Sequence, residues 1–344
     1  MEKGQKKLLI ISLGISLAVI FAVLLLTINA DTITALQSCM PGLLILALFL
    51  HAVSLIFWAA RIKLMCSSLG YKVRFTHCVN LVCSNTFIAS VTPSQIGGEP
   101  VRVYELTKAD VPGGNATAVI IMERVFDGII LAVGTGLCVF ALGVFFREIE
   151  LPNACIITAY LAAGIFAGLV LLFLFFAKNP RWGYALVGKI SQLISRKKSP
   201  EKMQASFKRF EGYVSQFYTT LSLFTGKAKA GLFFGLLFTL LYWANEFIIA
   251  FFICMGLGVE PTPALFLLSF IFQILITVIL MIPITPGGVG VAEISLGAFY
   301  ALIIPTSLVG IFVLIYRFIF YYFNLIVGFA ASMRIVRREA HTET

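Results

Sequence analysis

The stretch Pro283-Ile-Thr-Pro-Gly-Gly-Val-Gly-Val-Ala-Glu293 follows an apolar run, 264–282, and constrains how this chain can fold. An earlier stretch, Thr92-Pro-Ser-Gln-Ile-Gly-Gly-Glu99, follows the shorter apolar run 77–91 in the same way. Proline and glycine interrupt helices, and non-helical backbone survives at membrane depth only where protein buries it or water reaches it. Each stretch therefore predicts a re-entrant helical hairpin or a discontinuous helix, and such breaks commonly line a site.

Most of the remaining chain consists of apolar segments of membrane-spanning length. The 344 residues are 60% hydrophobic and only 12% charged, with a mean hydropathy of +0.98, which is not the composition of a soluble protein. A helix needs about 20 apolar residues to cross the hydrocarbon core. Six spans are predicted, at 8–28, 42–60, 117–146, 154–177, 231–255 and 308–333. The predicted fold class is all-α, a polytopic membrane protein with six transmembrane helices plus two re-entrant broken hairpins.

The basic residues predict the orientation. The net charge of +10 comes from 26 Lys and Arg against 16 Asp and Glu. Nearly all of the basic residues fall in alternate connections, which predicts a plasma-membrane protein whose N- and C-termini are both cytoplasmic. In a membrane protein such a positive charge does not indicate a nucleic-acid partner, and none is expected. The seven cysteines lack metal-ligand spacing, and no cofactor motif is present, so no metal site or cofactor is expected.

The basic segment 178–230 carries a predicted amphipathic helix. Its apolar residues recur at steps of three and four from Met203 to Leu221, on the face opposite Lys202, Lys208 and Arg209. A basic amphipathic helix can lie on the anionic inner leaflet. The alternative is that its apolar face packs on the protein's own bundle or on a second protomer of a homo-oligomer.

The two broken stretches align as an internal repeat. Thr92, Pro93, Gly97, Gly98 and Glu99 correspond to Thr285, Pro286, Gly287, Gly288, Gly290 and Glu293, and an arginine follows each set at similar spacing, Arg124 and Arg317. The chain divides into 1–146, with a hairpin at 77–108, and 147–344, with the basic insertion 178–230 and a hairpin at 264–304. Each half has an odd number of crossings, so the second would be inverted relative to the first, an architecture of transporters.

Ionisable residues within the predicted spans are the main functional candidates, because burying a charge in a bilayer is costly. They are Glu123, Arg124, Asp127, Glu246, Glu293 and Arg317. Arg317 lies deep in its span and requires a partner, for which Glu293 is the first candidate; by the repeat, Glu99 would pair with Arg124. Glu123, Asp127 and Glu246 are possible proton carriers. The alternative is that these ion pairs only fasten hairpins to spans.

A helix that begins after Thr-Pro-Gly-Gly would direct backbone N–H groups and a positive dipole end at an anion, and a nearby arginine could bind a phosphate with two hydrogen bonds. This predicts a substrate-binding site without catalytic residues or metal ligands. Its candidate residues are Thr92, Pro93, Gln95, Gly97, Gly98, Glu99, Arg102, Glu123, Arg124, Asp127, Glu246, Thr285, Pro286, Gly287, Gly288, Gly290, Glu293 and Arg317.

Three blocks carry a resemblance to a known family: Thr92 to Arg102, Glu123-Arg-Val-Phe-Asp127 and Pro283 to Glu293. In this order they resemble the signature blocks of the flippase-like transmembrane domain of lysylphosphatidylglycerol synthetases. The resemblance implies a translocase that moves phosphatidylglycerol or an aminoacylated phospholipid between leaflets. In the full-length enzymes a soluble C-terminal domain transfers lysine from lysyl-tRNA to phosphatidylglycerol. This chain stops shortly after its last span, so we expect no transferase domain and no enzyme activity.

Three other functions remain open. A polyprenyl-linked lipid is an alternative cargo. The same architecture would also serve an ion-coupled small-solute transporter, or a membrane partner or transferase in lipid-linked cell-envelope glycan synthesis.

Overall fold

The computed structural model describes residues 37, 39–92, 98–145, 153–185, 200–281, 285 and 287–342, and these residues form helices and connections without a strand. For 91, 153–156, 158, 159, 162, 163, 166, 200–210, 336 and 339–342 it describes the backbone alone. The elements in chain order are α3 (Pro41–Ser68), α4 (Phe75–Val91), α5 (Gly98–Thr107), α6 (Gly113–Phe145), α7 (Asn153–Lys178), α9 (Pro200–Thr225), α10 (Lys229–Gly256), α11 (Pro263–Leu280), α12 (Val291–Tyr300), α13 (Thr306–Arg317), the π-helical turn η1 (Phe318–Tyr322) and α14 (Phe323–Thr342).

Five helical segments of the described part are long and apolar enough to cross a membrane: α3, α6, α10, α11 and the continuous Thr306–Ile335. Four of them cover predicted spans, and α7, with 26 residues, covers the predicted span 154–177. The predicted span 8–28 lies outside the described residues. The fifth segment, α11, belongs to the second predicted hairpin, yet its 18 residues reach about 27 Å at 1.5 Å per residue. The chain is a multi-pass membrane protein, and its number of crossings stays a prediction.

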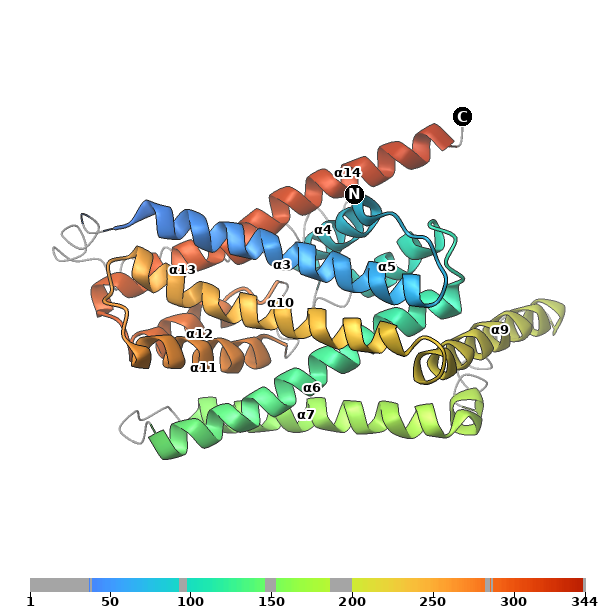
Figure 1. The fold of residues 1–344 in the computed structure, drawn as a ribbon, viewed down its shortest axis with the longest axis horizontal. Coiled ribbons are helices and arrows are strands. Elements are labelled where there is room, and N and C mark those ends of the chain that lie inside the picture. Colours follow the sequence, from blue (N-terminus) through green and yellow to red (C-terminus); the bar gives the residue numbers. More distant parts are fainter. Residues whose placement is uncertain are drawn as a thin grey trace.

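The long helices run along the longest axis of the molecule, and their connections gather at its two ends (Figure 1). One end holds the α3–α4 and α5–α6 connections, α9 and the C-terminal end of α14. The opposite end holds the α10–α11 and α12–α13 connections. The helix pair α4 and α5 therefore enters the bundle from one end, and the pair α11 and α12 enters from the other.

Helix packing brings the two halves of the chain together. Helix α3 lies against α10, α4 lies against α14, and α6 contacts both α7 and α11. Each pair of entering helices is interrupted inside the bundle, between Val91 and Gly98 and between Leu280 and Val291. The sequence predicts both interruptions from their proline and glycine content.

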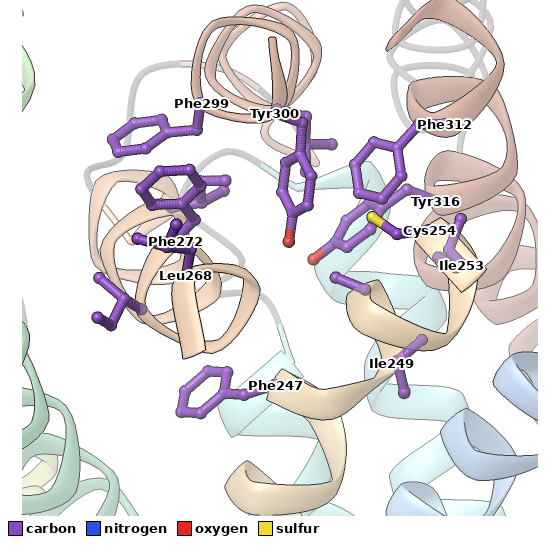
Figure 2. Packing of buried hydrophobic residues seen from close by; sticks show 14 of the residues in the cluster. Phe247, Ile249, Ile253, Cys254, Leu268, Phe272, Phe299, Tyr300, Phe312 and Tyr316 are labelled. Carbon is purple, nitrogen blue, oxygen red and sulfur yellow. The ribbon is translucent and has the colours of Figure 1, made fainter. Parts of the chain in front are cut away.

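An aromatic core fixes α12 and α13 against α11. Figure 2 shows the hydroxyl groups of Tyr300 and Tyr316 directed toward the same space between these helices. Gln273 of α11 joins the two, because its Nε2 donates to the Tyr300 hydroxyl at 2.9 Å and its Oε1 accepts from the Tyr316 hydroxyl at 2.8 Å. The Tyr300 ring also stacks on Phe312 with centroids 3.9 Å apart. Buried amide and hydroxyl groups thereby satisfy one another inside an apolar core.

The C-terminal half of α9 packs on the protein's own bundle. Val214, Phe217 and Leu221 are half-buried, and the side chain of Gln216 accepts a hydrogen bond from the backbone N–H of Gly114 at 3.1 Å. This contact supports the self-packing interpretation for that half. Met203, in the other half, belongs to the residues described by backbone alone, and contact of segment 178–230 with the inner leaflet stays a prediction.

Candidate functional site

A cavity of about 230 Å³ lies inside the bundle, where the two interrupted helix pairs meet. Both halves of the chain contribute to its wall, including Ser90 at the end of α4 and Gly287 in the second break. The acidic, basic and histidine residues that line the cavity are His51, Arg61, Arg124, Asp127, Glu246 and Arg317. Trp58 of α3 and Trp243 of α10 also line it. Four of the predicted site residues with charged side chains therefore share one cavity.

Arg61 connects three helices beside this cavity. From α3, its Nε donates to Glu123 of α6 at 2.7 Å, and its Nη1 donates to Asp127 at 2.8 Å and to Thr239 of α10 at 2.9 Å. Arg61 directly follows the predicted span 42–60, but α3 continues beyond that span to Ser68, and the arginine is 1% exposed. Its charge is compensated by two carboxylates.

Arg102, one of the predicted site residues, is also buried. It lies on α5 with no exposed surface and forms an ion pair with Glu123. Glu123 is thus held by Arg102 and Arg61, and Asp127 also accepts a hydrogen bond from Nε1 of Trp243 at 3.1 Å. Glu123 and Asp127 are therefore paired with arginines from two other helices, which argues against Glu123 as a mobile proton carrier.

Trp58 occupies the centre of this group of charges. The Cζ atoms of Arg61, Arg102 and Arg124 lie 5.9, 5.1 and 5.7 Å from its ring centroid, within the range of cation–π attraction. Its buried Nε1 has no hydrogen-bond partner among the described residues. An unpaired indole N–H beside a cavity is available to a ligand or a water molecule.

Arg124 is the arginine of this group with the loosest contacts. Its side chain is 39% exposed, and its nearest carboxylates are Asp127 at 3.4 Å and Glu99 at 3.9 Å. The expected Glu99–Arg124 pair is thus brought together, with a long contact. Because the guanidinium faces the cavity without a close bidentate partner among the described residues, it can accept an anion.

Arg317 forms the expected pair with Glu293. Its Nε lies 2.9 Å from Oε1 of Glu293, whose side chain is fully buried, and its Cζ lies 4.2 Å from the Tyr321 ring centroid. The other carboxylate oxygen of Glu293 accepts from the backbone N–H of Gly290 at 2.7 Å. The protein's own carboxylate therefore caps the Gly290 N–H at the start of α12, and an anion site at this helix end stays a prediction for the other N–H groups.

The glycines of the second break permit a close approach of the two halves. Gly287 has a positive φ of 62°, and a Cβ there would lie 2.8 Å from the carbonyl oxygen of Ser90 and 2.7 Å from the Tyr321 ring. A Cβ at Gly98 would collide with the side chain of Asn85, another cavity residue. The Asn85 side chain can shift, whereas the Ser90 carbonyl belongs to the backbone, so Gly287 requires glycine both for space and for conformation.

The other predicted residues of the breaks have local roles or lie outside the description. The hydroxyl groups of Thr92 and Thr285 donate to backbone carbonyls of their own segments, Ile88 at 2.8 Å and Val289 at 2.7 Å. Gly288 and Gly290 have positive φ angles of 67° and 85°. The following predicted site residues lie outside the described residues: Pro93, Gln95, Gly97 and Pro286.

His51 and Glu246 form a third polar contact in the cavity wall. Nδ1 of His51 lies 2.9 Å from Oε1 of Glu246, and Nε2 lies 3.0 Å from Oδ1 of Asn324. His51 thus joins α3 to α10 and α14. Its place in the same cavity as Glu246 could have been anticipated only by knowing that α3 packs on α10.

Comparison with known proteins agrees with the membrane architecture. The family model described as the lysylphosphatidylglycerol synthase TM region matches residues 9–328. A UPF0104 membrane protein of Archaeoglobus fulgidus is 30% identical over 292 residues, which cover 83% of this chain and 84% of that protein. A UPF0104 membrane protein of Methanocaldococcus jannaschii is 26% identical, covering 87% of this chain and 86% of that one.

A relative of a different length carries a different name. The protein named glycosyltransferase AglD of Haloferax volcanii is 25% identical over 85% of this chain, a match that covers 49% of AglD. The match of the family model to most of the sequence, together with the 30% identical relative from Archaeoglobus fulgidus, identifies this chain as a member of the lysylphosphatidylglycerol synthase transmembrane-region family.

Proposed function

We propose that this protein moves a phosphate-bearing lipid between the two leaflets, with the phosphate bound by Arg124 and Arg317 in the central cavity. One observation carries the proposal: these arginines, from different halves of the chain, line the same cavity. The lipid's headgroup would pass through this polar space while its acyl chains remain in the surrounding bilayer.

The wall chemistry suits a phosphorylated headgroup. A guanidinium group can hold two phosphate oxygens at once, and such charge-assisted bonds are about twice as strong as neutral ones. Arg124 is available for this role because its carboxylate contacts are long. Around the arginines lie small hydrogen-bonding side chains, Asn85, Thr86 and Ser90, which can accept and donate to glycerol or sugar hydroxyl groups.

The arrangement of the hairpins supports an inverted repeat, which would supply alternating access. The pair α4 and α5 enters from one end, the pair α11 and α12 enters from the other (Figure 1), and the two meet where Gly287 approaches Ser90. Inverted repeats that meet at a central site operate by rocking one unit against the other. In this proposal the meeting point of the breaks is the pivot beside the bound phosphate.

A lipid-linked sugar is the second candidate cargo. The relative named glycosyltransferase AglD favours it, because part of that protein resembles nearly all of this chain. A membrane unit that handles a lipid-linked sugar would still need a phosphate site, so both cargoes use the same two arginines and differ in the group beyond the phosphate.

The test is lipid translocation in proteoliposomes. Fluorescent phosphatidylglycerol, a lysylated analogue, phosphatidylcholine and a polyprenyl-phosphate sugar are each followed by chemical quenching of the outer leaflet. We expect protein-dependent movement of at least one phosphate-bearing probe beyond that of phosphatidylcholine. Arg124→Gln should slow it by about tenfold or more, since a charge-assisted hydrogen bond contributes about 1.5–3 kcal/mol.

Matched variants separate binding from folding. Arg317→Lys keeps the charge opposite Glu293 but removes the planar fork, and the double variant Glu293→Gln, Arg317→Gln leaves no buried charge unpaired. Arg337→Gln, at an exposed position near the end of α14, is the control for arginine removal. Equal rates in Arg124→Gln, Arg317→Lys and Arg337→Gln would overturn the site. Failure of every probe to move would favour a small-solute transporter.

A further inference from the structure

The buried contact of His51 with Glu246 requires one more proton than a neutral histidine and an ionised glutamate supply together. The two ring nitrogens of His51 face two oxygens, Oε1 of Glu246 at 2.9 Å and Oδ1 of Asn324 at 3.0 Å. A neutral imidazole has one N–H and one acceptor nitrogen, and an ionised carboxylate only accepts. A neutral histidine beside an ionised glutamate could satisfy only one of these contacts.

The orientation of Asn324 decides the proton count. Its Nδ2 donates to the backbone carbonyl of Phe320 at 2.8 Å, so a reversed amide would set its oxygen against that carbonyl. Oδ1 therefore faces the ring, and Nε2 of His51 must carry a hydrogen. The contact between Nδ1 and Glu246 then requires a second proton, either on Nδ1 or on the carboxylate.

The neighbouring charges of the described residues do not change this count. Arg61 and Arg102 hold Glu123 and Asp127, and Arg317 holds Glu293. Arg124 lies between Asp127 and Glu99. The four arginines thus face four carboxylates, and the pair of His51 and Glu246 sets the remaining charge, which is zero with its proton and minus one without it.

The groups that face this cavity from the surrounding helices are Arg61 of α3, Arg124 and Asp127 of α6, Tyr242 of α10, Tyr316 and Arg317 of α13, Tyr321 of η1 and Asn324 of α14.

We propose that the His51–Glu246 pair is a proton-binding site that couples proton uptake to the binding of an anionic headgroup in the same cavity. The coupling rests on the proposed function, whereas the proton site itself does not. The proton is transferred from a hydronium ion of the aqueous solution: one O–H bond of hydronium breaks and leaves water, and an N–H bond on Nδ1 or an O–H bond on Glu246 forms. Release is the reverse transfer from the same atom to a water molecule.

The sign of the coupling follows from charge. An anion binds more tightly when the pair is neutral than when it carries a negative charge, so anion affinity rises as pH falls. For one coupled proton, the affinity changes by up to about tenfold per pH unit within the titration range. By reciprocity the bound anion strengthens proton binding, so a transported anion and a proton would move in the same direction.

The proton site is tested by ¹⁵N NMR of the full-length protein labelled at histidine, in detergent micelles from pH 5 to 9. The chain has only 3 histidines, and His51→Gln and His77→Gln assign their signals. We expect the His51 signal to show a protonation step that Glu246→Gln abolishes or displaces. A ring that stays in one state across the range, or titrates identically in both proteins, overturns the proposal.

The coupling is tested by calorimetric titration with dihexanoyl phosphatidylglycerol in two buffers of different ionisation enthalpy. We expect wild type to take up a proton on binding and Glu246→Gln to take up none, with dihexanoyl phosphatidylcholine as the zwitterionic comparison. Translocation with equal pH dependence in wild type and Glu246→Gln would reject the coupling while the proposed function stands. A protonation step without any translocation would reject the proposed function while the proton site stands.

Discussion

At the scale of single residues, the buried Arg61 joins more of the bundle than either arginine in the proposed phosphate site. It binds two carboxylates of α6 and the hydroxyl group of Thr239 on α10. Its position could not be inferred from the pattern of charges, because it directly follows the apolar run 42–60 and resembles a residue just past a span. Helix α3 instead continues beyond Arg61, and the carboxylates that pair with Arg61 lie more than sixty positions away in the sequence.

Replacing Arg61 by alanine should be strongly destabilising. The change leaves Glu123 and Asp127 buried with one fewer cation, and breaking a buried ion pair by removing one partner costs about 3–5 kcal/mol. We expect a large fall in the Tm of the detergent-solubilised protein, measured in a thermal-shift assay. Arg337→Ala, at an exposed position, should stay within about 0.5 kcal/mol of wild type. Equal Tm values for the two variants would contradict a structural role for Arg61.

Trp58 is expected to stabilise the three guanidinium groups around it through its ring. Trp58→Leu removes the aromatic face from Arg61, Arg102 and Arg124, at a cost of about 2 kcal/mol or more where the group is desolvated. Trp58→Phe keeps an aromatic face and should lose clearly less. Unfolding in denaturant compares the two variants. If leucine is tolerated as well as phenylalanine, the ring contributes packing and no cation–π attraction.

At the scale of elements, the two breaks were predictable and their internal bonding was not. Proline and glycine after an apolar run indicate an interrupted helix, and the structure has interruptions at both places. The cap at the start of α12 cannot be recognised from the sequence, because a capping box is identified by a serine or threonine three residues before the glutamate. Here Gly290 occupies that position and only its backbone N–H takes part. The pairing of Glu293 with Arg317, in contrast, follows from the need to neutralise a deep arginine.

Two glycines of the second break should respond differently to alanine. Gly287 and Gly290 both have positive φ, so either substitution strains the backbone by roughly 1 kcal/mol. Only at Gly287 would the new Cβ also meet backbone, the Ser90 carbonyl at 2.8 Å, whereas the space at Gly290 is open. We expect Gly287→Ala to reduce both Tm and lipid translocation, and Gly290→Ala to lower Tm slightly. Equal changes in Tm and translocation for Gly287→Ala and Gly290→Ala would mean that neither stability nor transport depends on the close contact of Gly287 with Ser90.

At the scale of the whole molecule, the two pairs of interrupted helices enter the bundle from opposite ends (Figure 1), and this arrangement predicts opposite sidedness in the membrane. Lys108, just after α5, and Leu302, just after α12, are exposed at these two ends. Composition and span length predict a multi-pass helical protein. The sequence does not determine the number of crossings, because an 18-residue helix such as α11 is close to the length that separates a hairpin arm from a span.

The last prediction is the sidedness of single cysteines toward a membrane-impermeant maleimide. Lys108→Cys and Leu302→Cys are each made in a chain with Cys39→Ser and Cys155→Ser, since the other cysteines, Cys66, Cys78, Cys83, Cys138 and Cys254, are buried. Because basic residues are retained on the cytoplasmic side, we expect Lys108→Cys to react in inverted vesicles and Leu302→Cys to react in right-side-out vesicles. Arg337→Cys, near the end of α14, should react like Lys108→Cys. Reaction of Lys108→Cys and Leu302→Cys from the same side would exclude entry from opposite faces, and with it the alternating access on which the proposed translocation depends.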